Sequence, residues 1–277
     1  MMKISDVMTK EIVYAEVPGD AQEALDLMLK KNVSGLPVVK SGSQEIVGVL
    51  TRNDFSRRPD ETQLAMLMTR NVTSITPDTD IKSVVKIFLK KDFRRLPVVD
   101  DKLVGIVTIS DLVWKAVSQI NSKDTIEKYM KHDINVLWEE TPARIAFEIM
   151  GFSGARALPI LNSDLKLVGM LGDVDILRVA QRTESTKKSE SSGGTEGDKW
   201  GWDSKNVIYI TKKKLEIPKI PIKELMVKNL VTATKKTIVS KCAQRMAKSK
   251  VEQIPIVDTE GKIVGILKDK DLIRALI

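Results

Sequence analysis

The chain has little of what builds the commonest catalytic and metal sites. Its 277 residues include one cysteine, Cys242, and one histidine, His132. A single cysteine excludes an intrachain disulfide and favours a reducing compartment, so we expect a cytoplasmic protein. A single histidine excludes the usual multi-histidine metal sites, and we expect no bound metal and no required cofactor.

Long apolar runs are also absent. No stretch approaches the roughly 18 consecutive apolar residues of a membrane span. Residues 1–6 contain no apolar core of a secretion signal. Hydrophobic residues make up 42% of the chain and charged residues 30%, which is ordinary for a globular protein. We therefore expect a folded protein with no membrane partner.

The motifs of common enzyme classes are missing too. The chain has no Gly-x-x-x-x-Gly-Lys-Ser/Thr loop, no Gly-x-Gly-x-x-Gly fingerprint, no Gly-x-Ser-x-Gly elbow and no Cys-x-x-Cys pair. Cys242 lies in the helical pattern Val239, Cys242, Ala243, Met246, which favours a small buried residue over a nucleophile. We therefore expect that the protein is not an enzyme.

Positive charge is concentrated in one part of the chain. The net charge is +8, and residues 205–250 hold 13 basic residues against two acids, Glu216 and Glu224. Such a basic segment can attract nucleic acid or an acidic partner. A solvated, lysine-rich surface is the alternative, because the segment contains no aromatic residue besides Tyr209. Both interpretations stay open.

An apolar-Pro-apolar-apolar signal occurs four times, which indicates internal repeats. The four copies are Leu36-Pro37-Val38-Val39, Leu96-Pro97-Val98-Val99, Leu158-Pro159-Ile160-Leu161 and Ile254-Pro255-Ile256-Val257. A glycine follows each proline after eight to eleven residues, and an aspartate follows each glycine after six. The glycines are Gly48, Gly105, Gly169 and Gly265, and the aspartates are Asp54, Asp111, Asp175 and Asp271.

The third and fourth repeats are separated by an insertion at residues 183–206. The insertion is rich in serine, glycine, threonine and charge and has almost no aliphatic residue. It cannot bury enough apolar surface to order itself, so we expect a flexible loop. Trp200 and Trp202 dock either on the protein's own surface or on a partner, and the sequence does not decide between them.

The second repeat shows the secondary structure most clearly. Residues 72–75, 96–99 and 103–108 read as strands. Asp80 is a candidate N-cap for a helix, and a second helix is expected over residues 110–120. The order is β-α-β-β-α, in about 50 residues. Because one such unit is small for an independent core, we expect the repeats to pair.

This order resembles the CBS (cystathionine-β-synthase) repeat, whose signature is Gly-x-x-Thr-x-x-Asp after a strand. The first two repeats have it complete, with Thr51 and Thr108, whereas Gly172 and Lys268 replace the threonine in the other two. The resemblance implies an α+β fold of four β-α-β-β-α repeats paired into two Bateman modules. The first pair spans 1–120, with repeats at about 1–58 and 60–120. The second spans 121–277, with repeats at about 121–182 and 207–277 and the flexible insertion 183–206.

The resemblance also implies binding of adenosine-containing ligands in clefts between paired repeats. In the family the aspartate holds the ribose hydroxyls, the threonine lies near the phosphates, and backbone beside the apolar-Pro element and on the first strand reads the adenine. The glycines leave space for a ligand or another backbone. The candidate binding residues are Thr51, Asp54, Thr108, Asp111, Arg95, Leu36, Pro37, Val38, Leu96, Pro97, Val98, Asp175 and Asp271.

The same signature has a purely structural interpretation. Thr-x-x-Asp at a helix start is also a variant capping box, in which the threonine accepts an amide hydrogen bond and the acid reaches back. The third and fourth repeats lose the threonine and keep the aspartate, which favours a ligand contact. The helix dipole alone also favours an acid in the first turn, so both interpretations stay open.

Arg95 bears on the identity of the ligand. The segment Arg95-Leu96-Pro97 is similar to the Arg-Leu-Pro segment of the nucleotide-binding γ subunit of AMP-activated protein kinase, where arginines approach phosphates. Arginine suits phosphate, whereas Ser34 and Gly35 in the first repeat leave room for the sulfonium of S-adenosylmethionine. We expect AMP, ADP or ATP, with S-adenosylmethionine as the rival. Occupancy would act on a protein partner or on self-assembly, for example a homodimer.

Overall fold

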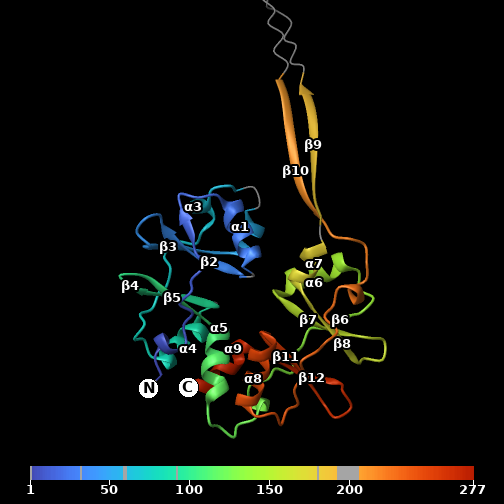
Figure 1. Ribbon diagram of the computed structural model, residues 1–277. Coiled ribbons are helices and arrows are strands. Elements are labelled where there is room, and N and C mark those ends of the chain that lie inside the picture. The colour runs from blue at the N-terminus through green and yellow to red at the C-terminus, as the bar shows by residue number, and fades with distance from the viewer. Residues whose placement is uncertain (1, 32, 59–60, 92, 180, 192–205) are drawn as a thin grey trace, which may run out of the picture. The chain divides into compact units, whose positions relative to one another are not determined.

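The computed structural model describes residues 2–31, 33–58, 61–91, 93–179, 181–191 and 206–277 (Figure 1). The chain forms two compact units. The first comprises residues 1–132, 231–258 and 264–277, and the second comprises residues 133–230 and 259–263. In the part of the chain that is described, no helix is both long enough and apolar enough to cross a membrane.

The first repeat forms a three-stranded sheet in the first unit. β1 (Ala15–Val17) pairs in parallel with β2 (Gly35–Lys40), and β2 pairs antiparallel with β3 (Ile46–Thr51). α1 (Ala21–Lys30) connects β1 to β2, and the Asp20 carboxylate caps it by accepting from two backbone N–H groups. α2 (Arg52–Arg57) follows β3 without a loop.

The second repeat, also in the first unit, follows the same order. α4 (Ile81–Lys90) begins at the predicted N-cap, because the Asp80 carboxylate accepts from the Ser83 amide. β4 (Arg95–Asp100) and β5 (Lys102–Thr108) form an antiparallel pair, and the expected strand at 72–75 is a single parallel bridge from Ile75 to Val98. The helix expected over 110–120 is three short pieces: α5 (Ile109–Asp111), the π-helix η2 (Leu112–Ala116) and the 3-10 helix η3 (Val117–Gln119).

Most of the third repeat lies in the second unit, and most of the fourth lies in the first. The third comprises β6 (Leu137–Trp138), α6 (Ala143–Ser153), β7 (Ala157–Leu161), β8 (Leu167–Gly172) and α7 (Asp173–Val179). The fourth comprises α8 (Val239–Ser249), β11 (Gln253–Val257), β12 (Ile263–Lys268), α9 (Asp269–Leu272) and η6 (Ile273–Leu276), with a parallel bridge from Ala233 to Ile256 as its first strand. The predicted α+β fold of four β-α-β-β-α repeats is confirmed.

A hairpin joins the third and fourth repeats. β9 (Gln181–Ser191) pairs antiparallel with β10 (Asn206–Glu216), so residues 183–191, expected in a loop, are a strand. The physical reason is the partner: β10 begins with β-branched and aromatic residues, and pairing satisfies the backbone of a segment that has little apolar surface. Residues 192–205, with Trp200 and Trp202, lie outside the described residues, and a flexible insertion stays a prediction.

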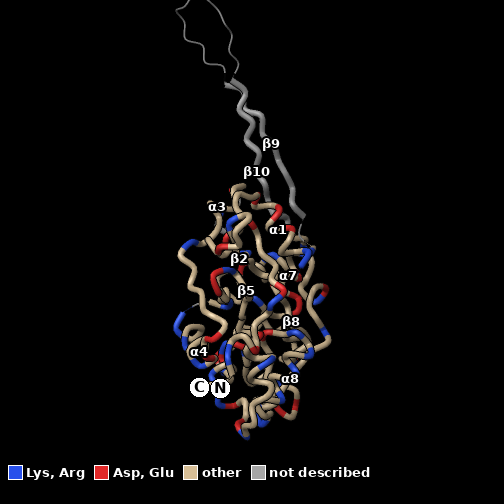
Figure 2. Tube along the Cα trace, turned by 60° about the vertical axis from the view of Figure 1, so that its left-hand side comes forward, with Lys and Arg blue, Asp and Glu red and all other residues tan. Residues whose placement is uncertain are grey.

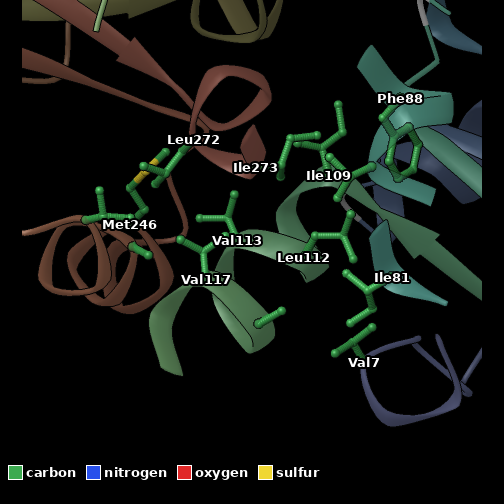
Figure 3. Packing of buried hydrophobic residues seen from close by; sticks show 14 of the residues in the cluster. Val7, Ile81, Phe88, Ile109, Leu112, Val113, Val117, Met246, Leu272 and Ile273 are labelled. Atoms are coloured by element: carbon green, nitrogen blue, oxygen red, sulfur yellow. The ribbon is translucent and has the colours of Figure 1, made fainter. Parts of the chain in front are cut away.

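The largest core of the first unit joins the second and fourth repeats. Val113 and Val117 lie beside Met246 and Leu272, and all four side chains are buried (Figure 3). The same cluster continues through α5 to α4. The first repeat has its own smaller cluster, and the second unit has a third one. The short helices α5 and α9 therefore begin on a shared apolar core, which fixes their positions relative to each other.

Candidate functional site

Each signature segment lies where a strand turns into a helix, and the same backbone hydrogen bond recurs at all four turns. The first helical residue donates its N–H to the carbonyl two residues before the apolar-Pro element. The four bonds are Arg52 to Ser34 at 3.3 Å, Ile109 to Arg94 at 3.1 Å, Asp173 to Arg156 at 3.0 Å and Asp269 to Glu252 at 2.8 Å. These bonds fix the helix start against the strand in every repeat.

Three of the four signature aspartates cap their own helix. The Asp54 Oδ2 accepts from the backbone N and the Oγ1 of Thr51, both at 2.7 Å. The Asp111 Oδ2 accepts from the same two atoms of Thr108, at 3.0 and 2.6 Å. In the third repeat the Asp175 Oδ2 accepts from the backbone N of Gly172 at 2.9 Å. The structure therefore contains the hydrogen bonds that the capping interpretation predicts.

The Asp111 carboxylate has two partners besides the helix cap. Its Oδ1 accepts from Thr9 Oγ1 at 3.1 Å and lies 2.8 Å from the Lys115 ammonium. Both carboxylate oxygens therefore have partners, and the residue is buried.

Asp271 differs from the other three aspartates. It is 4% exposed, and its buried Oδ2 has no hydrogen-bond donor among the described residues. Its Oδ1 lies 3.5 Å from the Lys131 ammonium and 3.8 Å from the Arg274 guanidinium. A buried acceptor without a donor is costly, so this oxygen is suited to receive a hydrogen bond from a bound molecule.

The apolar-Pro elements contribute backbone and not side chains. Leu36, Pro37, Val38, Leu96, Pro97 and Val98 are all buried within β2 and β4. The Pro97 carbonyl accepts from the Ile75 amide at 3.1 Å, which completes the bridge to the first strand of that repeat. Any role of these residues toward a ligand must therefore use main-chain groups.

The signature glycines receive methionine side chains. A β-carbon on Gly48 would lie 2.5 Å from the Met68 Sδ, and one on Gly105 would lie 2.5 Å from the Met8 Sδ. Met226 occupies the same place over Gly169, and Met130 over Gly265. The space at Gly48 and Gly105, which the sequence suggests for a ligand or a backbone, is therefore filled by side chains.

These contacts exchange segments between repeats. Met8 lies near the start of the first repeat and packs on the second, whereas Met68 lies near the start of the second and packs on the first. The third and fourth repeats exchange Met130 and Met226 in the same way. The sequence carries a signal for this that our sequence-based predictions missed: a buried apolar residue stands four positions before each methionine, namely Ile4, Leu64, Ile126 and Ile222.

Arg95 lies where the first and second repeats meet. Its Nη2 donates to the Ser34 Oγ at 2.6 Å, and its guanidinium occupies the space that a β-carbon on Gly35 would need. The structure thus brings the arginine of the second repeat against the serine-glycine pair of the first. Arg95, which the sequence suggests for phosphate, and the Ser34-Gly35 pair, which it suggests for a sulfonium, therefore belong to one contact.

Arg94 points to the fourth repeat. Its Nη2 lies 2.6 Å from the Asp269 Oδ2 and 2.9 Å from the Glu252 Oε2. Burial raises the pKa of the Asp269 carboxyl, and the charge of Arg94 offsets only part of that rise. Burial lowers the pKa of the Arg94 guanidinium, but the two carboxylates outweigh it and raise the pKa above its ordinary value. Arg94 therefore stays charged.

The second unit carries a hollow of about 500 Å³. It lies between the segment that enters β6 and the carboxyl-terminal end of α6, within the third repeat. Phe152, which is 87% exposed, stands at its edge. None of its lining residues is charged: they are Ile134, Asn135, Val136, Leu137, Ile149, Phe152 and Ser153.

The chain is similar to known proteins, in sequence and in structure, over its whole length. Protein MJ1225 of Methanocaldococcus jannaschii is 23% identical over 296 residues, which cover 99% of this chain and 98% of the relative. The crystal structure of MJ1225, described as a candidate archaeal homologue of γ-AMPK, covers 100% of both chains with a TM-score of 0.75 and 22% identity. An uncharacterised conserved protein from Pyrococcus horikoshii covers 100% of both chains with a TM-score of 0.69 and 26% identity.

The family model gives the most specific match. The CBS domain matches four times, at residues 4–61, 64–117, 126–182 and 222–277. These ranges contain all four signature segments and cover most of the chain. The longest stretch that they leave out lies between the third and fourth repeats. The chain belongs to the CBS domain family.

Proposed function

We propose that this protein is a regulatory binding protein for an adenosine-containing ligand, held at the signature segments between paired repeats. The ligand is an adenine nucleotide, AMP, ADP or ATP, and S-adenosylmethionine is the rival. Binding acts on a protein partner or on self-assembly, because a ligand that favours one arrangement of the repeats shifts the population toward it.

The observation that carries the proposal is the unpartnered Oδ2 of Asp271. In the other three signature aspartates the Oδ2 accepts a hydrogen bond from the backbone at the helix start. In the fourth repeat the Oδ2 is buried and has no donor among the described residues. A ribose hydroxyl supplies the missing donor, as hydroxyls do for acidic residues in dinucleotide sites.

The hollow in the third repeat lies in the second unit and is a second candidate contact for an adenine ring, considered separately from Asp271 of the first unit. The hollow has a volume of about 500 Å³ and is open to the surface, so it would cover one face of a bound ring and not enclose it. An uncharged lining with Phe152 at the edge suits a heteroaromatic ring, and Asn135 and Ser153 offer polar groups to its edge. It lies against the first strand of its repeat, where the family resemblance locates the base.

Calorimetric titration with AMP, ATP and S-adenosylmethionine tests the proposal. We expect saturable heat with at least one adenine nucleotide and a weaker response to S-adenosylmethionine. Asp271→Asn should weaken every adenosine ligand, because the amide offers the ribose a weaker acceptor than the carboxylate. The absence of binding by all three ligands would contradict the proposed function.

Nucleic-acid binding through residues 205–250 is the second candidate. Lys241, Arg245 and Lys248 are exposed along α8, and this helix has no acidic residue. Figure 2 marks the basic and acidic residues along the chain, with α8 labelled. Their spacing places them on one face of the helix. A gel-shift series with duplex DNA and single-stranded RNA checks this candidate. Binding should weaken steeply with salt, and no retardation at low salt would exclude it.

A further inference from the structure

Arg94 forms a shielded ionic junction between the second and fourth repeats, inside the first unit. Its two terminal nitrogens donate to the two Asp269 oxygens, Nη2 at 2.6 Å and Nη1 at 3.3 Å. Nη2 also lies 2.9 Å from Glu252. The Asp269 side chain is 1% exposed and that of Arg94 is 22% exposed, so solvent screens the pair only weakly. A bidentate pair fixes the relative orientation of its two partners as well as their distance.

The junction connects the starts of two signature helices. The Arg94 carbonyl accepts from Ile109, the first residue of α5, and the Glu252 carbonyl accepts from Asp269, the first residue of α9. The Arg94 side chain therefore joins two equivalent hydrogen-bonded pairs, one in each repeat. A second link runs beside it, because the Ser110 Oγ lies 3.4 Å from the Asp269 Oδ2.

The positions next to this junction are the candidate ligand groups. Ser110 immediately precedes Asp111, and Asp269 lies two residues before Asp271 in the same short helix. Any movement of the start of α5 must either carry Asp269 with it or break a buried bidentate pair, which leaves an uncompensated charge. The shared core beneath the two helices makes their packing one cooperative element.

We propose that Arg94 couples the signature segment of the second repeat to that of the fourth. A ligand at Thr108 and Asp111 repositions the start of α5, and the Arg94–Asp269 pair passes this change to α9 and Asp271. The inference rests on the proposed function, because it takes both segments as ligand sites. The coupling is reciprocal, so occupancy of the fourth repeat changes affinity at the second by the same factor.

Arg94 is a positioning residue in this scheme, and Arg95 has a different task. Arg95 donates to Ser34 of the first repeat, whereas Arg94 reaches Asp269 and Glu252 of the fourth. Two consecutive side chains thus connect the second repeat to two different neighbours. A movement of residues 94–95 therefore acts on both the first and the fourth repeat.

Hydrogen exchange on the full chain tests the coupling. The variant is R94M/D269L, which replaces the pair by apolar side chains and leaves no uncompensated charge in the interior. The control is D124L/K128M, which removes an exposed ion pair of 2.5 Å in the same unit. All proteins also carry Asp271→Asn, so that AMP, the probe, does not protect α9 by direct binding there.

We expect AMP to protect α5 and to change exchange in α9 when Arg94 and Asp269 are present. In R94M/D269L the protection of α5 should persist while the response of α9 is lost. The control should behave like the parent. A response of α9 that survives in R94M/D269L would overturn the proposal, and so would a parent in which AMP protects α5 and leaves α9 unchanged.

A ligand-free arm separates this inference from the proposed function. In the absence of AMP, Asp111→Asn should change exchange in α9 by about fivefold, the lower end of typical coupling factors. The same substitution in R94M/D269L should change exchange in α9 by no more than the loss of global stability explains, which urea denaturation of the same variants measures. If AMP does not bind the wild-type protein at all, the proposed function with this ligand fails, and the ligand-free arm still decides whether Arg94 couples the helices.

Discussion

The Met68 sulfur lies where a side chain on Gly48 would begin, 2.5 Å from the position of a β-carbon. Met68 enters the second repeat and Gly48 belongs to the first, so the contact joins two repeats. The same relation recurs with Met8 on Gly105, and in the other pair of repeats. The signature glycine therefore provides the space in which a methionine of another repeat packs. This structural role does not depend on a ligand.

Alanine at these glycines should therefore weaken the fold. Gly48→Ala should lower the free energy of unfolding by about 1–3 kcal/mol, the usual cost of overpacking. Gly265→Ala should cost more, because there the β-carbon also meets the Lys131 carbonyl oxygen at 2.7 Å, and backbone gives less easily than a methionine. Urea denaturation measures both changes.

A matched control is available in α6. Gly151 is a helical glycine with nothing within 4 Å of the position that a β-carbon would take. Gly151→Ala should stabilise the protein by about 0.5–1 kcal/mol through the higher helix propensity of alanine. Equal destabilisation by all three alanines would contradict the packing argument.

The signature aspartates should separate into two types, those whose carboxylate caps a helix and Asp271, whose Oδ2 does not. Asp111→Asn should lower the free energy of unfolding by about 1–2 kcal/mol, because its carboxylate accepts from Thr108, Thr9 and Lys115. Asp271→Asn should change stability less than Asp111→Asn does, because its Oδ2 has no donor and its Oδ1 pairs only with the exposed cations of Lys131 and Arg274. Thermal and urea unfolding of the two variants, with ligand affinity measured in parallel, distinguishes the types. A large stability loss in Asp271→Asn would show that this oxygen has a structural partner.

Arg95→Ala should discriminate among ligands. If the guanidinium contacts phosphate, affinity for AMP and ATP should fall by about 1.5–3 kcal/mol, the range of hydrogen bonds to charged groups, while affinity for adenosine changes little. Calorimetry with AMP and adenosine on wild type and variant measures the difference. An equal loss for both ligands would mean that Arg95 acts through its contact with Ser34 and not on phosphate.

Cys242 should be unreactive in the folded protein. Burial raises the pKa of its thiol from 9.0 to about 11, so the thiolate is scarce at pH 8. A disulfide reagent should label it in urea and not in buffer. The unfolded thiol loses its proton first as pH rises, so the wild type should lose more stability between pH 9 and about 11 than Cys242→Ala does. Rapid labelling of the native protein at pH 8 would contradict this account.

The fold was predictable from the sequence where one local rule dominated. The apolar-Pro strands, the Asp80 cap and the helical stripe of α4 form as expected, because periodicity and capping act within a few residues. The first strand of the second repeat shrank to one bridge, and the helix after Asp111 became three short pieces. The pieces of this helix pack against α8 and η6 of the fourth repeat, and no local pattern encodes that contact.

The site was predictable in its residue types and only partly in its contacts. The capping interpretation of Thr-x-x-Asp follows from spacing and is present in the first two repeats. The orphaned oxygen of Asp271 and the two destinations of Arg94 and Arg95 arise from contacts between residues far apart in sequence. The methionine over each glycine could have been predicted, because an apolar residue stands four positions before the methionine in all four repeats. The pairing of repeats into modules over 1–120 and 121–277 stays a prediction.

A crystal structure of the protein with AMP tests the central claim most directly. The account predicts electron density for the nucleotide with a ribose hydroxyl within hydrogen-bond distance of a signature aspartate, foremost the Oδ2 of Asp271. Well-ordered density for AMP away from all four signature segments, or crystals that exclude AMP at saturating concentration, would contradict it.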